Sequence, residues 1–159
     1  MASTGTPASD ASGDDLATQL ARRAAAIMWN EDRASQALGM TLTDVGPGRA
    51  TMRMAIRADM TNGHGICHGG YMFLLADSTL LAYACNSHDQ RAVAAGAEIH
   101  FAASAHEGDI LTAQGREAHR AGRSGIYDIE VRDQEGRPRR FSAGVRRRSR
   151  ALTQPRAAD

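Results

Sequence analysis

Apolar residues recur with two different periods along this chain, and the change of period predicts its elements. From Asp15 to about Met28 they recur three or four residues apart, which predicts a helix, and a second short helix is expected from Asp32 to Leu38 before Gly39. Beyond Gly39 apolar and polar residues alternate, which is typical of half-buried strands. The predicted strands are Met40 to Val45, Ala50 to Ile56, Val93 to Ala103, Ile110 to about His119, Tyr127 to Val131, and a last one around Phe141 to Val145.

One stretch breaks the alternation. From Gly70 to Cys85 nearly every helical face is apolar, which predicts a long, buried helix, and Asp77 is the one carboxylate in it. An ionised carboxylate only accepts hydrogen bonds, and the amides inside a helix are already used, so Asp77 needs a partner from elsewhere or a wet cleft. The order strand, strand, helix, four strands predicts an α+β fold with an antiparallel sheet of five to six strands curved around the helix.

The loop before this helix carries the complementary chemistry. Gly69 and Gly70 stand at the helix start, where backbone N–H groups lack partners and bear partial positive charge, so they can bind an oxyanion or a polarised carbonyl. Asp77 follows Gly69 by eight residues, which is about 12 Å along one helix. One copy cannot easily bring both groups to one reacting atom, whereas two antiparallel copies at a two-fold interface can.

Length and composition bound the picture. The chain of 159 residues fits a single domain over 15–148, with a small polar lead over 1–14 that we expect to be disordered and a loose tail over 149–159. The net charge of +1 implies no general attraction to nucleic acid or membrane, although all 19 basic residues are arginine. Two cysteines, and the absence of a signal peptide or a long apolar run, favour a cytoplasmic protein.

Other readings of the same loop stay open. His64, Cys67 and His68 could hold a metal, but a convincing second pair of ligands is missing, so no metal is expected. Cys67 beside a helix start could instead be a nucleophile. His68 could simply cap the helix, and Asn62 before Gly63 is a common turn pair. The arginines from Arg146 to Arg150 fit a solvated strand end, because the chain has few aromatic residues for stacking nucleic acid.

The motifs together resemble a known family. Asn62, the string HGG ending at Gly70, LADS from Leu75 to Ser78, the following CNS and the later GIYDIE resemble hot-dog fold acyl-CoA thioesterases of the phenylacetate-pathway (hydroxyphenylacetyl-CoA) group. The resemblance covers about Gly39 to Arg148. It implies a helix wrapped by a sheet, dimers pairing into a tetramer, and a site shared between subunits. It also implies that Asp77 is nucleophile or general base, that Gly69 N–H is the oxyanion donor, and that Asn62 and His68 place thioester and water.

The expected function is therefore hydrolysis of an acyl-CoA thioester, aryl-acetyl-CoA or similar, to free acid and CoA without a cofactor. Gly70 and Phe73 are expected to contact substrate, and Arg120 and Arg123, beside a glycine turn, to bind the phosphates of CoA. Two alternatives remain open. One is a non-catalytic acyl-CoA-binding regulator, which gives no reason to bury Asp77, and the other is an acyl-thioester dehydratase acting on a β-hydroxyl.

Overall fold

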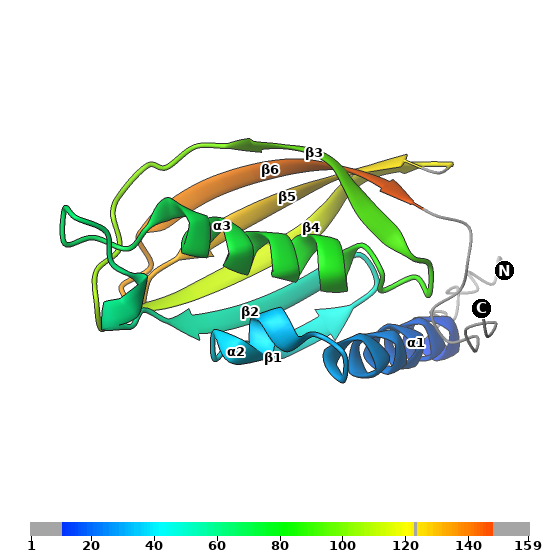
Figure 1. Cartoon of the computed structure of the whole chain (residues 1–159). Helices are drawn as coiled ribbons and strands as arrows, with labels where there is room; N and C mark the ends of the chain where they lie inside the picture. The colour runs from blue at the N-terminus through cyan, green and yellow to red at the C-terminus, as the bar shows by residue number, and fades with distance from the viewer. Residues whose placement is uncertain (1–10, 123, 148–159) are drawn as a thin grey trace, which may run out of the picture.

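The computed structural model describes residues 11–122 and 124–147, which form one antiparallel sheet, a central helix against it and two helices beside one edge (Figure 1). The helices are α1 (Ala11–Trp29), α2 (Arg33–Ala37) and α3 (Gly69–Asp77), with a short 3₁₀ turn η1 (Ala58–Met60) and a π-helical continuation of α3, η2 (Ser78–Ala84). The strands are β1 (Thr41–Gly46), β2 (Arg49–Ala55), β3 (Ala92–Ile99), β4 (Ile110–Ala121), β5 (Ser124–Arg132) and β6 (Pro138–Arg147).

The sheet has the order β1-β2-β4-β5-β6-β3, and every neighbouring pair is antiparallel. It curves so that both edge strands, β1 and β3, contact the central helix (Figure 1). The α+β class predicted from the order of elements is confirmed. In the described part of the chain, no helix is both long and apolar enough to cross a membrane.

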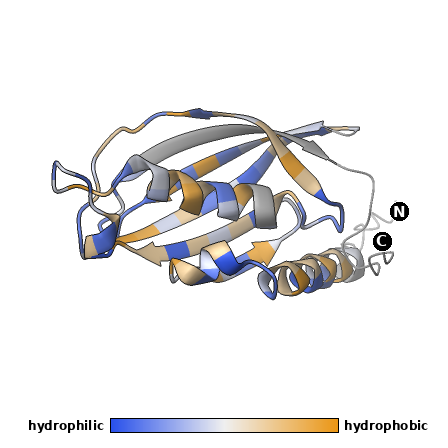
Figure 2. Ribbon diagram, viewed as in Figure 1, coloured by the Kyte–Doolittle hydropathy of each residue, from blue (hydrophilic) through white to orange (hydrophobic). Residues whose placement is uncertain are grey.

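Alternation along the middle strands builds the core. In β2, Ala50, Met52 and Met54 are buried while Arg49, Arg53 and Ala55 are exposed, and the same period continues in β4 and β5 as bands of contrasting hydropathy (Figure 2). Because successive side chains point to opposite faces, one face of each strand meets the central helix. Tyr127, Ile129 and Val131 of β5 are buried as predicted.

The central helix is not buried all round, which corrects the sequence prediction. Met72, Leu75 and Leu80 are buried against the sheet, whereas Phe73, Leu74 and Asp77 are only partly buried. The reason is that a single sheet covers one side of a helix, and residues 11–122 and 124–147 form no second sheet for the other side. Immediately after Asp77 the helix widens into π geometry, with Cys85 N–H donating to the carbonyl of Leu80.

The strand β3 departs furthest from its predicted pattern. It ends at Ile99 rather than Ala103, and its residues are mostly exposed, including Val93 at 45% and, beyond its end, Phe101 at 54%. The alternation of Ala97, Ile99 and Phe101 predicted one buried face, but an edge strand bonded only to β6 is covered on that face only in part. The outer side of β3 has no neighbour among the described strands.

The helix α1 begins earlier than predicted. Residues 11–14 belong to it, so the expected disordered lead is wrong for these four. Residues 1–10 and the predicted tail 149–159 lie outside the described residues. Three small residues, Ala21, Ala24 and Ala25, make the buried face of α1, and an apolar pocket of about 420 Å³ remains between α1 and β1.

Candidate active site

His68 fixes the start of the central helix. It is the N-cap residue of α3 with extended backbone, and its Nδ1 accepts a hydrogen bond from Gly70 N–H at 3.0 Å. Its carbonyl accepts from Tyr71 N–H, also at 3.0 Å. Because Nδ1 accepts, the neutral ring carries its proton on Nε2, and the side chain is exposed, so this N–H is available to a bound molecule. A capping acceptor and an exposed N–H donor are therefore combined in one side chain.

The Gly69 N–H, in the first turn of α3, is unpaired among the described residues. Gly70 and Tyr71 donate to His68, whereas within the described chain Gly69 N–H meets no acceptor. A Cβ atom at Gly69 would lie 3.0 Å from the Phe101 ring, so this ring packs directly against the glycine. An unpaired donor at a helix N-terminus, bounded by an aromatic ring, is suited to a polarised carbonyl oxygen.

The loop leading to His68 is held at several points. Asn62 N–H donates to Ile66 carbonyl at 2.8 Å, and Asn62 carbonyl accepts from Gly65 N–H at 2.9 Å, where Gly65 has a positive φ of 70°. Asn62 Oδ1 accepts from His64 N–H at 2.9 Å, so the turn reading of Asn62 is correct. Its amide nitrogen donates to no group in residues 11–122 and 124–147, and it is available to a ligand as well.

Asp77 is the unpaired carboxylate that its sequence context predicts. It is partly buried at the end of α3, and no side chain or amide of the described residues bonds it. Burial raises the pKa of Asp77 above its ordinary value, with no compensating partner. A carboxylate kept in this state is a competent general base or nucleophile.

A partly exposed stripe connects the two groups. Gly70, Phe73 or Leu74, and Asp77 follow one another at intervals of three or four residues, and all are at least partly accessible. The stripe runs along the side of the helix that the sheet leaves uncovered. Within one copy Gly69 and Asp77 remain about 12 Å apart along the helix axis.

Comparison with known proteins assigns the chain to a family. A family model described as thioesterase superfamily matches residues 64–139. The acyl-coenzyme A thioesterase PaaI of Escherichia coli K12 is 42% identical over 108 residues, 68% of this chain and 76% of PaaI. The chain belongs to the thioesterase superfamily.

Solved thioesterase-superfamily structures agree with the assignment. The structure of E. coli PaaI, a protein of the phenylacetic acid degradation operon, matches with a TM-score of 0.82 and 36% identity over 84% of this chain and 97% of PaaI. A Streptococcus mutans protein, smu.793, bound to acetyl CoA, matches with a TM-score of 0.66 over 70% of this chain and 90% of that one; its 21% identity shows the hot-dog fold alone.

The arginines expected at the CoA phosphates are placed differently from the other site residues. Arg120 lies near the tip of the β4–β5 hairpin, 41% exposed, with its Nε 3.7 Å from Glu117 Oε1. Glu117 also bonds His88, which follows the C-terminal end of the central helix, so within one copy Arg120 lies beyond the helix end opposite Gly69. Arg123 lies outside the described residues.

The two other readings of this loop, a nucleophilic thiol and a metal site, can be compared with the structure. Cys67 is buried, and its Sγ lies 3.5 Å from the carbonyl of His68, so the thiol does not face the accessible stripe. Across the described residues, no three His, Cys, Asp or Glu side chains are grouped to hold a metal ion. Phe101 was not predicted at the site, because alternation only placed it within a strand; its closeness to Gly69 brings it to the candidate site.

Proposed function

We propose that this protein hydrolyses acyl-CoA thioesters to a free acid and CoA. The observation that carries the proposal is the pair of unsatisfied groups on one helix, the Gly69 N–H and the Asp77 carboxylate. A stability role explains neither, because an unpaired donor and an unpaired, partly buried carboxylate both cost free energy. Similarity to PaaI, an acyl-CoA thioesterase, supports this substrate class.

In the proposed reaction the thioester carbonyl oxygen accepts from Gly69 N–H, and Asp77 of the facing subunit attacks the carbonyl carbon or removes a proton from the attacking water. His68 Nε2–H and the Asn62 amide orient carbonyl and water. The carbonyl oxygen gains negative charge as the tetrahedral intermediate forms, where a fixed donor is most effective. The intermediate then expels the CoA thiolate, which takes up a proton. Where water attacks, this yields the free acid directly; where Asp77 attacks, it leaves a mixed anhydride, which water hydrolyses to the free acid and the Asp77 carboxylate. No metal or redox cofactor is required.

The site needs a second copy of the chain, and β3 offers the surface for it. The outer edge of β3 has no partner strand among the described residues, and Val93 and the nearby Phe101 are exposed. Unpaired edges with apolar side chains favour pairing with another strand. Antiparallel pairing of two β3 strands about a two-fold axis would bring the uncovered stripes of two central helices together in opposite directions. A dimer of dimers is the proposed assembly.

The acyl group proposed for this site is aromatic. The Phe101 ring borders Gly69, and Phe73 lies on the stripe that leads to Asp77, so an aryl-acetyl group next to the carbonyl would meet aromatic walls. Aryl-acetyl, benzoyl and straight-chain CoA esters should be compared by release of the CoA thiol. We expect the highest kcat/KM for an aryl-acetyl ester. Thiol release from none of them would contradict the proposed function, and an enoyl product from a hydroxyacyl-CoA would indicate a dehydratase.

Subunit mixing tests the shared site directly. An Asp77→Asn subunit keeps Gly69, and a Gly69→Ala subunit keeps Asp77. A mixed dimer therefore has one site with both groups intact and one site with both groups changed. We expect activity to reappear on mixing, at a fraction of the wild-type rate. Both variants must first be shown to assemble by light scattering. An active monomer at assay concentration would contradict the shared-site proposal.

A further inference from the structure

The loop from Ala105 to Asp109 touches the active-site segment at one point. The carbonyl of Ala105 accepts a hydrogen bond from Cys67 N–H at 2.7 Å, and Cys67 stands two residues before Gly69. The next residue, His68, is held by its own N–H on the carbonyl of Met60 at 2.9 Å. Ala105 is fully buried, so its carbonyl cannot exchange this donor for water. The position of Ala105 therefore helps to determine where the Gly69 N–H points.

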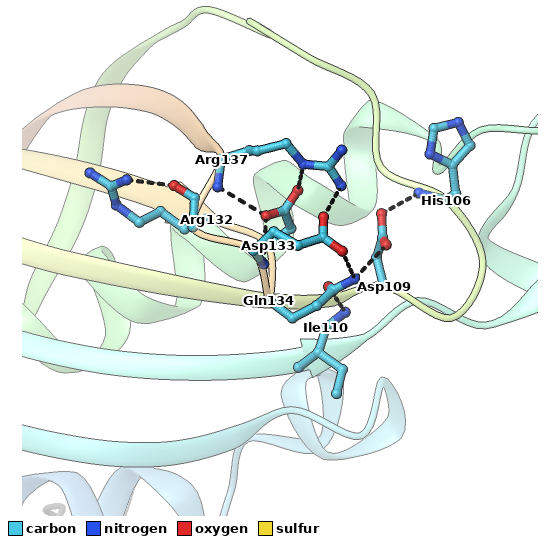
Figure 3. Close-up of polar contacts among 9 residues, drawn as sticks. His106, Asp109, Ile110, Arg132, Asp133, Gln134 and Arg137 are labelled. Atoms are coloured by element: carbon cyan, nitrogen blue, oxygen red, sulfur yellow. Dashed lines mark hydrogen bonds and ion pairs between the residues drawn. The ribbon is translucent and has the colours of Figure 1, made fainter.

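The Asp109 carboxylate holds this loop by hydrogen bonds. Its Oδ2 accepts from His106 N–H at 2.8 Å, and its Oδ1 accepts from the side-chain amide of Gln134 at 3.0 Å (Figure 3). Its backbone carbonyl accepts from Ile56 N–H at 2.8 Å, at the end of β2. The residue is only 9% exposed. Both carboxylate oxygens of Asp109 thus hold this loop, in which Ala105 is a small buried side chain.

Gln134 connects Asp109 to the turn between β5 and β6. While its amide nitrogen donates to Asp109, its Oε1 accepts from Ile110 N–H at 2.9 Å. The turn itself is rigid, because the fully buried Asp133 side chain accepts from the backbone N–H groups of Glu135 and Arg137 and from Arg137 Nε (Figure 3). The sheet thereby supplies a fixed reference for the loop.

We propose that Asp109 and Gln134 are positioning residues for the oxyanion donor, acting through the Ala105 carbonyl and the Cys67 N–H to set the direction of Gly69 N–H. This inference rests on the proposed function. Neither side chain touches the proposed substrate. Misplacement of a reacting group by about 1 Å can cost on the order of 100-fold in rate, so small movements of this loop are sufficient to matter.

The pair has a polarity that can be reversed. Asp109 offers two acceptors, whereas Gln134 offers one donor and one acceptor, and the backbone N–H groups of His106 and Ile110 fill the outer positions. An Asp109→Asn substitution leaves two donors facing each other whichever way the amides turn. Combining it with Gln134→Glu restores a donor and an acceptor at the contacts with His106, residue 109 and Ile110 and keeps the net charge unchanged; the long 3.5 Å bond from Gln134 to Glu135 is lost. The double variant is therefore a rescue with the same atoms in reversed roles.

The kinetic test compares these variants on the best CoA ester. We expect Asp109→Asn to lower kcat about 10-fold with KM within about twofold, and the double variant to return kcat to within about threefold of wild type. Tyr127→Phe is the matched control, because the hydrogen bond that it removes, to Glu117, holds neither this loop nor the turn that carries Gln134. It should lower Tm but leave kcat within about twofold. An unimpaired Asp109→Asn, or a double variant as impaired as the single one, would overturn the proposal.

Hydrogen exchange separates this inference from the proposed function. The Cys67 amide is held by Ala105, so its exchange should accelerate about 10-fold in Asp109→Asn, return in the double variant and change little in Tyr127→Phe. This readout needs no substrate. If wild-type protein hydrolyses no CoA ester, the proposed function fails while exchange at Cys67 still decides the coupling. Unchanged exchange in Asp109→Asn would refute the coupling even in an active enzyme.

Discussion

The two halves of the central helix, α3 with its cap His68 and the π-helical η2, differ in whether their polar groups have hydrogen-bond partners. From Ser78 onward the polar side chains are satisfied within the chain: Ser78 Oγ lies 2.8 Å from Ser35 Oγ, Thr79 Oγ1 donates to Leu75 carbonyl at 2.7 Å, and Tyr83 O–H donates to Asp32 at 3.1 Å. From His68 to Asp77, the Gly69 N–H and the Asp77 carboxylate are left unsatisfied by the described residues. The polar groups of one half are used within the fold, and the other half leaves two groups unpaired, as the proposed function requires.

The boundary between the halves lies at Asp77 itself. The helix changes to π geometry at Ser78. Beyond the end of the helix, the polar side chains are again paired: Glu117 accepts from Tyr127 O–H at 2.6 Å and pairs with His88 at 3.1 Å. π-helical turns cost stability and are frequent at functional sites. Burial alone therefore does not distinguish a candidate functional polar residue from a structural one, whereas the lack of a hydrogen-bond partner does.

The largest expected effect comes from removing the unpaired charge. Asp77→Asn keeps the size and hydrogen-bonding capacity of the side chain but cannot act as base or nucleophile, so kcat should fall at least about 10²-fold. Steady-state kinetics on the best CoA ester, with circular dichroism to confirm folding, measures it. A folded Asp77→Asn protein within a few-fold of wild type would make both halves of the helix structural, and an inactive Cys67→Ala would then favour the thiol.

The two roles of His68 can be separated by substitution. Asparagine is a good N-cap residue but lacks an equivalent of Nε2–H, so His68→Asn should keep Tm close to wild type while kcat falls about 10-fold. His68→Ala loses the cap as well and should destabilise the protein by about 1 kcal/mol. Thermal melts and kinetics of the two variants measure this. Equal kcat in wild type and His68→Asn would show that His68 only caps the helix.

Substitution of Arg120 and Arg123 tests whether residues beyond the C-terminal half of the central helix bind the phosphates of CoA. In the proposed antiparallel pair, Arg120 of one copy approaches the Gly69 end of the other. Replacing Arg120 and Arg123 together by alanine should raise KM for the CoA ester several-fold, while hydrolysis of a short thioester without the nucleotide changes little. Equal losses on both substrates would exclude these arginines from phosphate binding.

A smaller effect, on stability alone, is expected at Glu117. Burial opposes its ionisation, but the hydrogen bond from Tyr127 and the charge of His88 outweigh it and lower the pKa of Glu117 below the ordinary 4.5. The stabilisation is therefore present above pH 4.5 and is lost as the pH falls through the lowered pKa. Tyr127→Phe should cost about 1 kcal/mol at pH 7 and less in acid, with kcat within about twofold. Denaturant melts at both pH values measure the difference.

The smallest effect has the opposite sign and belongs to Asp77. Because burial raises the pKa of Asp77, the folded protein binds its proton more tightly than the unfolded chain does, and stability falls as the pH rises from the ordinary 3.8 through the raised pKa. Asp77→Asn should therefore raise Tm slightly at pH 7 and leave it unchanged below pH 3.8. A lower Tm at pH 7 would indicate that the carboxylate has a stabilising partner in the assembled protein.

The sequence predicted what depends on local pattern. Alternation predicted the buried faces of β2 and β5, and a carboxylate in an apolar helix predicted the unpaired Asp77. The exposure of β3 could not be predicted, because alternation states which residues share a face but not whether another layer covers that face. Ser78 Oγ meets Ser35 Oγ, 43 residues away, and no local pattern indicates this contact.

Contacts made through backbone atoms left no trace in the sequence at all. The bond from Cys67 N–H to Ala105 carbonyl joins two residues whose side chains do not reveal it, and Asp109 and Gln134 resemble ordinary turn residues. Phe101 continues an alternating pattern, which predicts the face of the strand on which it lies but not its contact with Gly69. Each of these depends on how distant segments meet, which periodicity does not encode.

The alanine face of α1 has a consequence for the order in which the protein comes apart. Alanine side chains bury little area, and Leu16, Leu20 and Ile27 of the same helix remain exposed, so α1 gains far less from docking than the central helix does. Elements with few buried apolar contacts open first in native conditions. Mild protease treatment should therefore cut within α1 while the sheet and central helix survive as a trimmed fragment.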